Sequence, residues 1–232
     1  MVVSRQALRA VPTFSALTDE QLDALLAACR TVTYPRAAVL FSEGDRGDSL
    51  LVVLSGQVKV SLLGQSGREV ILAILGERDV LGEMALLDEE STRSATATAL
   101  NAVTALQCLR RDLTEAFRNE SFVRSLGKLV QDRLRDTNEQ FRDRSTLDIP
   151  DRLLRVLLRL ARTWGSLEQT RIVIRPRPTH EVLAQLVGCE RETVTRTLKE
   201  LQAVRLITVE GQSLILRERA LGRLGIGRER VG

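Results

Sequence analysis

Residues 82–88 read GEMALLD, and residues 93–96, shortly after, read RSAT. Gly82 opens this stretch, and the residues after it are predicted to form a short helical turn. The backbone N–H groups at the start of such a turn are unpaired and favour an anion. Arg93 supplies a planar fork of donors that suits a phosphate better than a lysine does. Glu83 suits a sugar hydroxyl instead, because a carboxylate accepts hydrogen bonds. The stretch therefore predicts a pocket for a ribose phosphate.

A surface turn, with Glu83 and Arg93 solvated or paired with each other, is the alternative for so short a pattern. The whole string favours the pocket, because GEMALLD followed by RSAT resembles the phosphate-binding cassette of cyclic-nucleotide-binding domains. In that family the Gly and Glu lie at the ribose, and the Arg and Ser hold the cyclic phosphate. The resemblance places these roles on Gly82, Glu83, Arg93 and Ser94, with Met84 and Ala85 in the same turn.

The composition is that of a two-domain protein with aliphatic cores. The chain has 232 residues, of which 3% are aromatic. No apolar run reaches membrane-spanning length, and the first residues lack the apolar segment of a signal peptide. We therefore expect a cytoplasmic protein with no membrane partner.

Cysteine and histidine are scarce. Cys29, Cys108 and Cys189 are far apart, and an odd number without CxxC spacing argues against a disulfide framework or a zinc ribbon. We expect all three to be buried small hydrophobic residues. The single histidine, His180, excludes a site that needs two histidines from one chain.

Positive charge is concentrated near the C-terminus. Residues 148–232 hold 16 Lys+Arg and 10 Asp+Glu, whereas the remaining residues hold 18 and 20. A basic C-terminal third on a slightly acidic body indicates a polyanionic partner at that end.

Around the cassette, residues 32–109 alternate short apolar runs with glycine turns, which predicts an antiparallel β sandwich or barrel. The expected strands are 38–41, 50–54, 58–63, 70–75 and 103–109. Residues 4–30 are predicted to be helical, with Leu22, Leu25 and Leu26 on one face. The pattern from Phe41 to Val60 also resembles the β-roll of cyclic-nucleotide-binding domains, so this resemblance covers roughly residues 15–110.

Residues 111–145 predict one long helix, because they lack proline and carry an apolar seam. Its members are Val123, Leu126, Val130, Leu134, Thr137 and Phe141. So narrow a stripe on so long a helix predicts a homodimer. Thr137 and Asn138 interrupt the stripe: either a polar residue fixes the register, or, as the resemblance implies, Thr137 reaches the base of a bound nucleotide and Asn138 reaches it from the partner. Arg133, one turn earlier, is placed to pair with Glu83.

The C-terminal third predicts a winged helix-turn-helix. Helices are expected over residues 152–164 and 179–202, the second interrupted by the Gly188 turn, with a strand at 171–175. A hairpin over residues 206–216 supplies the wing.

Arg191, Glu192, Thr195 and Arg196 share the face of the second helix opposite its leucines. A solvated charged face is the alternative. Against it, residues 186–194 (LVGCERETV) closely resemble the recognition motif of the bacterial cAMP receptor protein and fumarate–nitrate regulator (CRP/FNR) family, in which Arg, Glu and Arg contact the bases of a TGTGA half-site. The resemblance places base contacts on Arg191, Glu192 and Arg196, and phosphate contacts on Thr179 and Thr193. Glu190 and Glu181 depart from the family pattern and add negative charge near DNA.

Together the two resemblances identify the chain as a member of this family, in the cAMP-receptor branch. They imply an α+β fold with three parts: a nucleotide-binding β-roll with its N-terminal helix (1–110), a dimerisation helix and hinge (111–147) and a winged helix-turn-helix (148–232). They imply cAMP as the effector, with no metal, haem or iron–sulfur cluster. They also imply a homodimer, double-stranded DNA of the type TGTGA-N6-TCACA, and RNA polymerase as a further partner.

Other classes fit less well. An iron–sulfur sensor needs clustered cysteines, and an enzyme needs a catalytic constellation that the sequence does not offer. A haem sensor needs a histidine near the pocket, whereas His180 lies in the C-terminal domain, where it either flanks the DNA backbone or is exposed. A nucleotide-binding module that does not bind DNA does not need a winged helix-turn-helix, which residues 179–216 are predicted to form. The main alternative is a regulator that binds DNA constitutively, with a vestigial pocket or one tuned to another small ligand.

Overall fold

The computed structural model describes residues 3–65, 67–86, 92–168 and 171–223. The chain divides into two compact units, residues 1–62 with 73–137 and residues 63–72 with 138–232. Within the described ranges, none of the helices combines the length and the apolar character needed to cross a bilayer.

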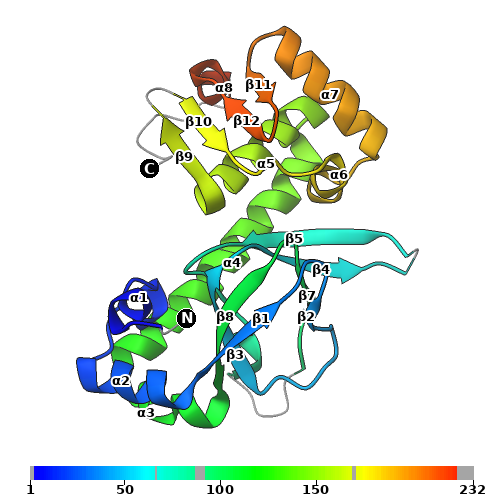
Figure 1. Cartoon of the computed structure of the whole chain (residues 1–232). Coiled ribbons are helices and arrows are strands. Elements are labelled where there is room, and N and C mark those ends of the chain that lie inside the picture. Colours follow the sequence, from blue (N-terminus) through cyan, green and yellow to red (C-terminus); the bar gives the residue numbers. More distant parts are fainter. Residues whose placement is uncertain (1–2, 66, 87–91, 169–170, 224–232) are drawn as a thin grey trace. The chain divides into compact units, whose positions relative to one another are not determined.

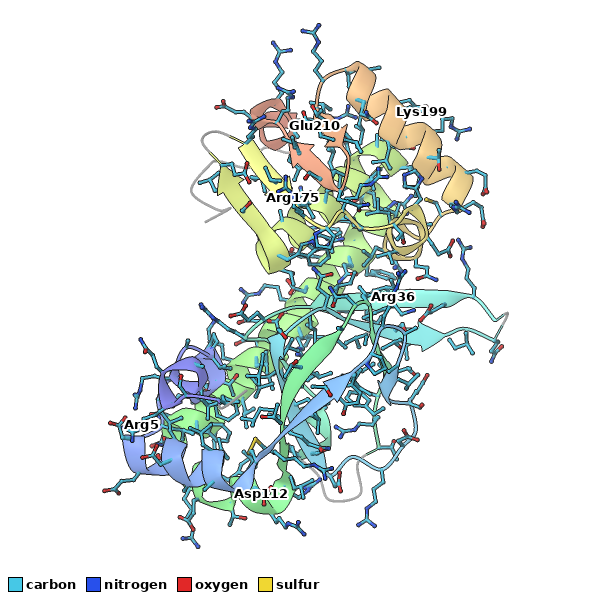
Figure 2. The ribbon with its side chains drawn as sticks, viewed as in Figure 1. Arg5, Arg36, Asp112, Arg175, Lys199 and Glu210 are labelled. Atoms are coloured by element: carbon cyan, nitrogen blue, oxygen red, sulfur yellow. A yellow bond between two sulfur atoms is a disulfide. The ribbon has the colours of Figure 1, made fainter. Side chains whose placement is uncertain are left out.

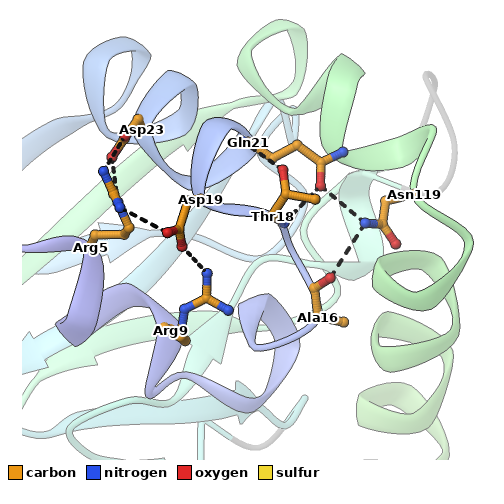
Figure 3. A network of polar contacts seen from close by, with 8 residues as sticks. All are labelled: Arg5, Arg9, Ala16, Thr18, Asp19, Gln21, Asp23 and Asn119. Atoms are coloured by element: carbon orange, nitrogen blue, oxygen red, sulfur yellow. Dashed lines mark hydrogen bonds and ion pairs between the residues drawn. The ribbon is translucent and has the colours of Figure 1, made fainter.

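The first unit begins with three short helices in place of the predicted continuous helical stretch: α1 (Arg5–Arg9), η1 (Pro12–Phe14) and α2 (Asp19–Ala28). Pro12, which has no backbone N–H, begins the middle one. Thr18 and Gln21 form a capping box at the start of α2. Ion pairs then join α1 to α2, as Figure 3 shows: Arg5 with Asp19 and Asp23, and Arg9 with Asp19.

Two four-stranded sheets follow, and their described pairings are antiparallel (Figure 1). The first has the order β1-β8-β3-β6 and consists of β1 (Arg30–Tyr34), β3 (Ser49–Ser55), β6 (Val80–Leu81) and β8 (Val103–Leu109). The second has the order β2-β7-β4-β5 and consists of β2 (Val39–Phe41), β4 (Val58–Leu63), β5 (Glu69–Leu75) and β7 (Thr96–Ala99). Side chains from both sheets share one aliphatic core, among them Leu51, Val58, Ala97 and Ala105. The predicted antiparallel β region is confirmed.

Cys29 and Cys108 form a disulfide, drawn as a yellow bond in Figure 2. Arg30 of β1 pairs with Gln107 of β8, so the two cysteines lie opposite each other with Cα atoms 4.5 Å apart. Cys108 belongs to the core that includes residues of the N-terminal helices, and Cys29 is partly buried against it. The expectation of three buried cysteines without a disulfide was wrong for Cys29 and Cys108, because strand pairing joins residues that are 79 apart in sequence. The burial expected of Cys29 and Cys189 was wrong as well, since both are only partly buried. Cys189 is free.

The predicted long helix is interrupted near its start. It is preceded by η3 (Arg110–Leu113) and α3 (Thr114–Phe117), and the continuous part, α4, spans Glu120–Thr146. The break is at Asn119, whose side-chain oxygen accepts from the N–H groups of Ser121 and Phe122. An asparagine that satisfies these donors favours a new helix start.

The second unit contains α5 (Ile149–Trp164), which Asp148 caps ahead of Pro150. A four-stranded sheet has the order β11-β12-β10-β9, made by β9 (Gly165–Glu168), β10 (Arg171–Ile174), β11 (Ile207–Glu210) and β12 (Ser213–Leu216). Helices α6 (His180–Val187), α7 (Arg191–Ala203) and α8 (Glu218–Arg223) complete the unit. The hairpin β11–β12 is the predicted wing, and α6 and α7 are the two helices of the predicted helix-turn-helix.

Candidate functional site

The cassette begins at Gly82, directly after β6, and leads into η2 (Met84–Leu86). Gly82 has a φ of +82°, a conformation that favours glycine. The N–H of Leu86 donates to the carbonyl of Glu83 at 3.0 Å. The predicted helical turn is therefore present, as a 3-10 turn. Residues 87–88, which belong to the same cassette in the sequence, lie outside the described residues.

Arg93 is held inside the β region, with only 5% of its surface exposed. Its Nη1 donates to the Gly82 carbonyl at 3.1 Å, and its Nη2 donates to Ser49 Oγ at 3.0 Å. The guanidinium carbon lies 4.3 Å from the centroid of the Phe41 ring, a cation–π contact. These three partners fix the side chain beside the cassette.

The close approach of Arg93 explains why position 82 is a glycine. A Cβ atom built on Gly82 would lie 2.3 Å from Arg93 Nη1 and 2.9 Å from the Ser49 carbonyl oxygen. Any side chain there would displace the arginine as well as strain the backbone. Gly82 therefore provides the space that Arg93 occupies.

Glu83 is more deeply buried than Arg93, with 1% of its surface exposed. Its Oε1 accepts from Arg133 Nη1 of α4 at 2.6 Å, which confirms the pairing predicted from the sequence. Arg133 also donates to the carbonyl of Val80. The cassette carboxylate is thus tied to the long helix, and its charge is compensated.

One oxygen and one nitrogen of this cluster have no hydrogen-bond partner among the described residues: Glu83 Oε2 and Arg93 Nε, both buried. Leaving such atoms unpaired costs free energy. Burial lowers the pKa of Arg93, and the carboxylates of Asp48 and Glu83 oppose that shift. A buried acceptor and a buried cation at one turn suit a ligand with both a hydroxyl and a negative charge.

The remaining predicted pocket residues lie nearer the surface. Met84 is 50% exposed, and Ser94 Oγ donates to its sulfur at 3.6 Å. Thr137 is exposed on α4, and its hydroxyl donates to the Arg133 carbonyl at 2.9 Å. Asn138, the next residue, is exposed as well. Ala85 lies within η2.

The helix-turn-helix is built by a cap, a glycine and an apolar face. Thr179 Oγ1 accepts from the Val182 N–H at the start of α6. Gly188 ends α6 in the left-handed conformation with a φ of +77°. The inner face of α7 is buried at Val194, Leu198 and Leu201.

The opposite face of α7 presents Arg191, Glu192 and Arg196, all exposed. Thr193 and Thr195 are partly buried beside them. Arg196 approaches Glu200 at 3.8 Å, an exposed pair that contributes little to stability. The face is thus a set of charged groups available to a partner, as the sequence predicts.

The chain matches two family models. Residues 31–120 match the cyclic nucleotide-binding domain, and residues 151–224 match the Crp-like helix-turn-helix domain. A CRP-like cAMP-activated global transcriptional regulator of Mycobacterium tuberculosis is 32% identical over 204 residues, which are 88% of this chain and 91% of that protein. The chain belongs to the cAMP receptor protein and fumarate–nitrate regulator family.

Two further relatives support this membership. A cyclic AMP receptor protein of Thermus thermophilus is 33% identical over 216 residues, covering 92% of this chain and 96% of that protein. The solved structure of the c-di-GMP responsive global regulator CLP of Xanthomonas campestris matches with a TM-score of 0.70 and 27% identity, over 86% of this chain and 99% of that one. This family member is therefore a DNA-binding transcription regulator with a cyclic nucleotide-binding domain, and not an enzyme.

Sequence reasoning missed two residues of the cassette cluster, Phe41 and Ser49, and one contact of His180. Phe41 and Ser49 hold Arg93, and they come from strands that precede the cassette by more than thirty residues. His180 contacts Thr195 on α7. An aromatic residue in a β-strand indicates core packing as readily as a cation–π contact, so Phe41 gave no distinctive sign. The sequence placed His180 in the C-terminal domain, flanking the DNA backbone or exposed, but gave no sign of its contact with Thr195.

Proposed function

We propose that this regulator is controlled by cAMP, which binds at the cassette turn and changes the affinity of the helix-turn-helix for DNA. The observation that carries the proposal is the buried cluster of Gly82, Glu83 and Arg93, in which an acceptor and a donor are unpartnered. The relatives named for cAMP activation support the choice of nucleotide.

The chemistry of the cluster divides the ligand into two parts. Arg93, with Ser94 beside it, suits the cyclic phosphate, since a guanidinium donates to two oxygens of one anion. Glu83 suits the ribose hydroxyl, because its Oε2 is an acceptor without a partner. The backbone of Met84 and Ala85 lines the same turn.

Arg133 links this chemistry to the long helix. It pairs with Glu83, and one turn further along α4 stand Thr137 and Asn138, which we propose to close over the base, Asn138 acting from the partner subunit. A ligand that contacts Glu83 therefore acts on a side chain already bonded to α4. Such a ligand switches the protein only if it binds the DNA-competent state more tightly than the other state.

We propose that α4 forms a homodimer. Val123, Leu134 and Phe141 are exposed by 43%, 61% and 74%. Val123 and Leu134 are 11 residues apart, and Leu134 and Phe141 are 7 apart, which are sums of the three- and four-residue steps of a coiled-coil seam. Leu126, predicted to lie in this seam, is instead buried in the first unit's own core, so the seam consists of Val123, Val130, Leu134 and Phe141 around Thr137. A two-fold pair of helices would bury them.

On the DNA side, we propose that Arg191, Glu192 and Arg196 contact base edges in the major groove. An arginine fork matches the two acceptors of guanine, and a glutamate accepts from the cytosine amino group. Thr179 and Thr193 are proposed to contact the backbone, and Thr195 lies on the same face of α7 as the two arginines. A two-fold dimer then meets a palindrome of the type TGTGA-N6-TCACA, with half-sites one helical turn apart. A contact with RNA polymerase remains a prediction from the family resemblance.

A second candidate is regulation by another nucleotide, or DNA binding without any ligand. This candidate is supported by the structural match to a regulator named as c-di-GMP responsive, because the same fold there accompanies a different nucleotide. The candidates differ in which ligand, if any, binds at the cassette.

Titration calorimetry separates them with the full chain and four ligands: cAMP, cGMP, c-di-GMP and 5′-AMP. We expect cAMP to bind most tightly. Arg93→Ala should weaken cAMP binding about 100-fold, since it removes charged hydrogen bonds worth about 3 kcal/mol. Arg36→Ala, an exposed arginine labelled in Figure 2, is the matched control and should bind normally. Equal cAMP affinity in wild type and Arg93→Ala would contradict the pocket.

A further inference from the structure

The only histidine of the chain lies beside the surface that we propose to contact DNA. His180 is the first residue of α6 and directly follows Thr179, the capping residue that we place at the DNA backbone. Its Nδ1 lies 2.8 Å from Thr195 Oγ1 on α7. The imidazole therefore connects the start of one helix to the exposed face of the other.

The hydrogen bonds around Thr195 determine which nitrogen of His180 carries the proton. The Thr195 hydroxyl donates its one hydrogen to the Arg191 carbonyl at 3.0 Å. With its hydrogen used in this way, the Thr195 oxygen accepts from His180, and on that basis we assign the proton to Nδ1. In the neutral ring Nε2 is left as an acceptor, and an acceptor cannot bind a phosphate oxygen. Protonation turns Nε2 into a donor with a positive charge.

The surroundings of His180 disfavour its protonated form in the absence of DNA. Burial lowers its pKa, and the cations Arg177, from the segment before α6, and Arg191, from α7, lower it further. The neighbouring carboxylate, Glu181, accepts from Gln185 at 3.4 Å on the same helix. DNA phosphates that approach Arg177 and Arg191 make the electrostatic potential at His180 more negative. They therefore favour its protonated form.

We propose that His180 is a phosphate-binding residue of the DNA interface that acts in its protonated form, so that the protein takes up a proton when it binds DNA. Thr195 orients the ring through Nδ1, and Nε2–H donates to a backbone phosphate next to the one that Thr179 contacts. This inference rests on the proposed placement of α6 and α7 on DNA. It adds a DNA contact whose strength depends on pH and not on the base sequence.

The linkage has a definite sign. A group that binds a proton more tightly in the complex makes the affinity rise as pH falls through the pKa of the complex. Each unit by which DNA raises the pKa gives about tenfold tighter binding at low pH. We expect DNA affinity to rise about threefold to tenfold between pH 8 and pH 6.

The first test is an NMR titration of the full chain, free and bound to a duplex. Because the chain has a single histidine, the imidazole Hε1 signal belongs to His180 without assignment. We expect a pKa below the ordinary histidine value in the free protein and a higher one in the complex. An equal or lower pKa in the complex would overturn the proposal.

The second test measures DNA affinity against pH at constant ionic strength, because phosphate contacts depend strongly on salt. His180→Asn keeps a donor near Thr195 but cannot be protonated, so the slope of affinity with pH should vanish. Lys199→Gln, on α7 and labelled in Figure 2, removes a charge that does not titrate in this range and should keep the slope. A wild-type slope in His180→Asn would refute the proton uptake. Absence of specific DNA binding by the wild type, both with and without cAMP, would instead refute the interface itself.

Discussion

The two functional regions of this regulator hold their key side chains in opposite ways. In the cassette, Glu83 and Arg93 are buried and bonded to the scaffold before any ligand arrives. On α7, Arg191, Glu192 and Arg196 are exposed and carry few intramolecular bonds. The cassette side chains are therefore fixed before any ligand binds, whereas the side chains that we propose to contact DNA are held by few bonds within the chain.

This difference has an energetic consequence. Buried charged groups belong to the fold as well as to the site, so their replacement affects stability and binding together. Exposed groups affect binding alone, because surface substitutions usually change stability by less than about 0.5 kcal/mol. The predictions below test that contrast, in order of decreasing effect.

The largest effect is expected at the buried ion pair. Arg133→Met leaves Glu83 charged and uncompensated, and should lower the free energy of unfolding by about 3 kcal/mol. The double variant Glu83→Gln/Arg133→Met removes both charges and should recover a large part of that loss. Urea unfolding followed by circular dichroism measures both. A double variant less stable than Arg133→Met would show that the pair is not what stabilises this turn.

The disulfide beneath the N-terminal helices comes next. Cys29→Ser/Cys108→Ser should lower the free energy of unfolding by about 2–4 kcal/mol, because the bond closes a long loop in the unfolded chain. Cys189→Ser is the matched control, since this cysteine is free and should change stability little. If the double variant has the same urea midpoint of unfolding as the wild type, the Cys29–Cys108 bond does not contribute to stability.

Arg191, which we propose to contact DNA, should show the opposite pattern, with weaker DNA binding and unchanged stability. Arg191→Ala should cost about 1–3 kcal/mol of binding free energy on the matched duplex and relax preference at one base position. Its unfolding curve should match that of the wild type. Competition binding against duplexes changed at single positions is the measurement. Equal weakening on every sequence would mean that Arg191 contacts the backbone rather than a base.

Much of the fold was predictable because it depends on local patterns. Apolar spacing and the Gly188 turn predicted α6 and α7, and the glycine-separated apolar runs predicted five strands of the β region. Strands β1, β6 and β7 were missed. Strand β6 has only two residues, and β7 reads TATA and has no large apolar residue. The break before α4 depends on the Asn119 side chain, which apolar spacing does not register.

The site was predictable where one motif carries it and not where distant strands meet. Glu83, Arg93 and Arg133 were found from the cassette and from helix spacing. The partners of Arg93 depend on how β2 and β3 are placed in two different sheets, and the disulfide depends on the β1–β8 register. Such long-range pairings are absent from residue spacing, and hence Phe41, Ser49 and the Cys29–Cys108 bond required the structure.

The central claim is that the buried cassette and the exposed helix form one switch. It is tested most directly by titrating a TGTGA-N6-TCACA duplex with the full chain, at fixed salt and pH, with and without saturating cAMP. The account predicts that cAMP tightens binding to this duplex many-fold and that Arg93→Ala removes the effect. Tight binding of the same strength with and without cAMP would contradict it, leaving the DNA-binding face in place but separating it from the nucleotide.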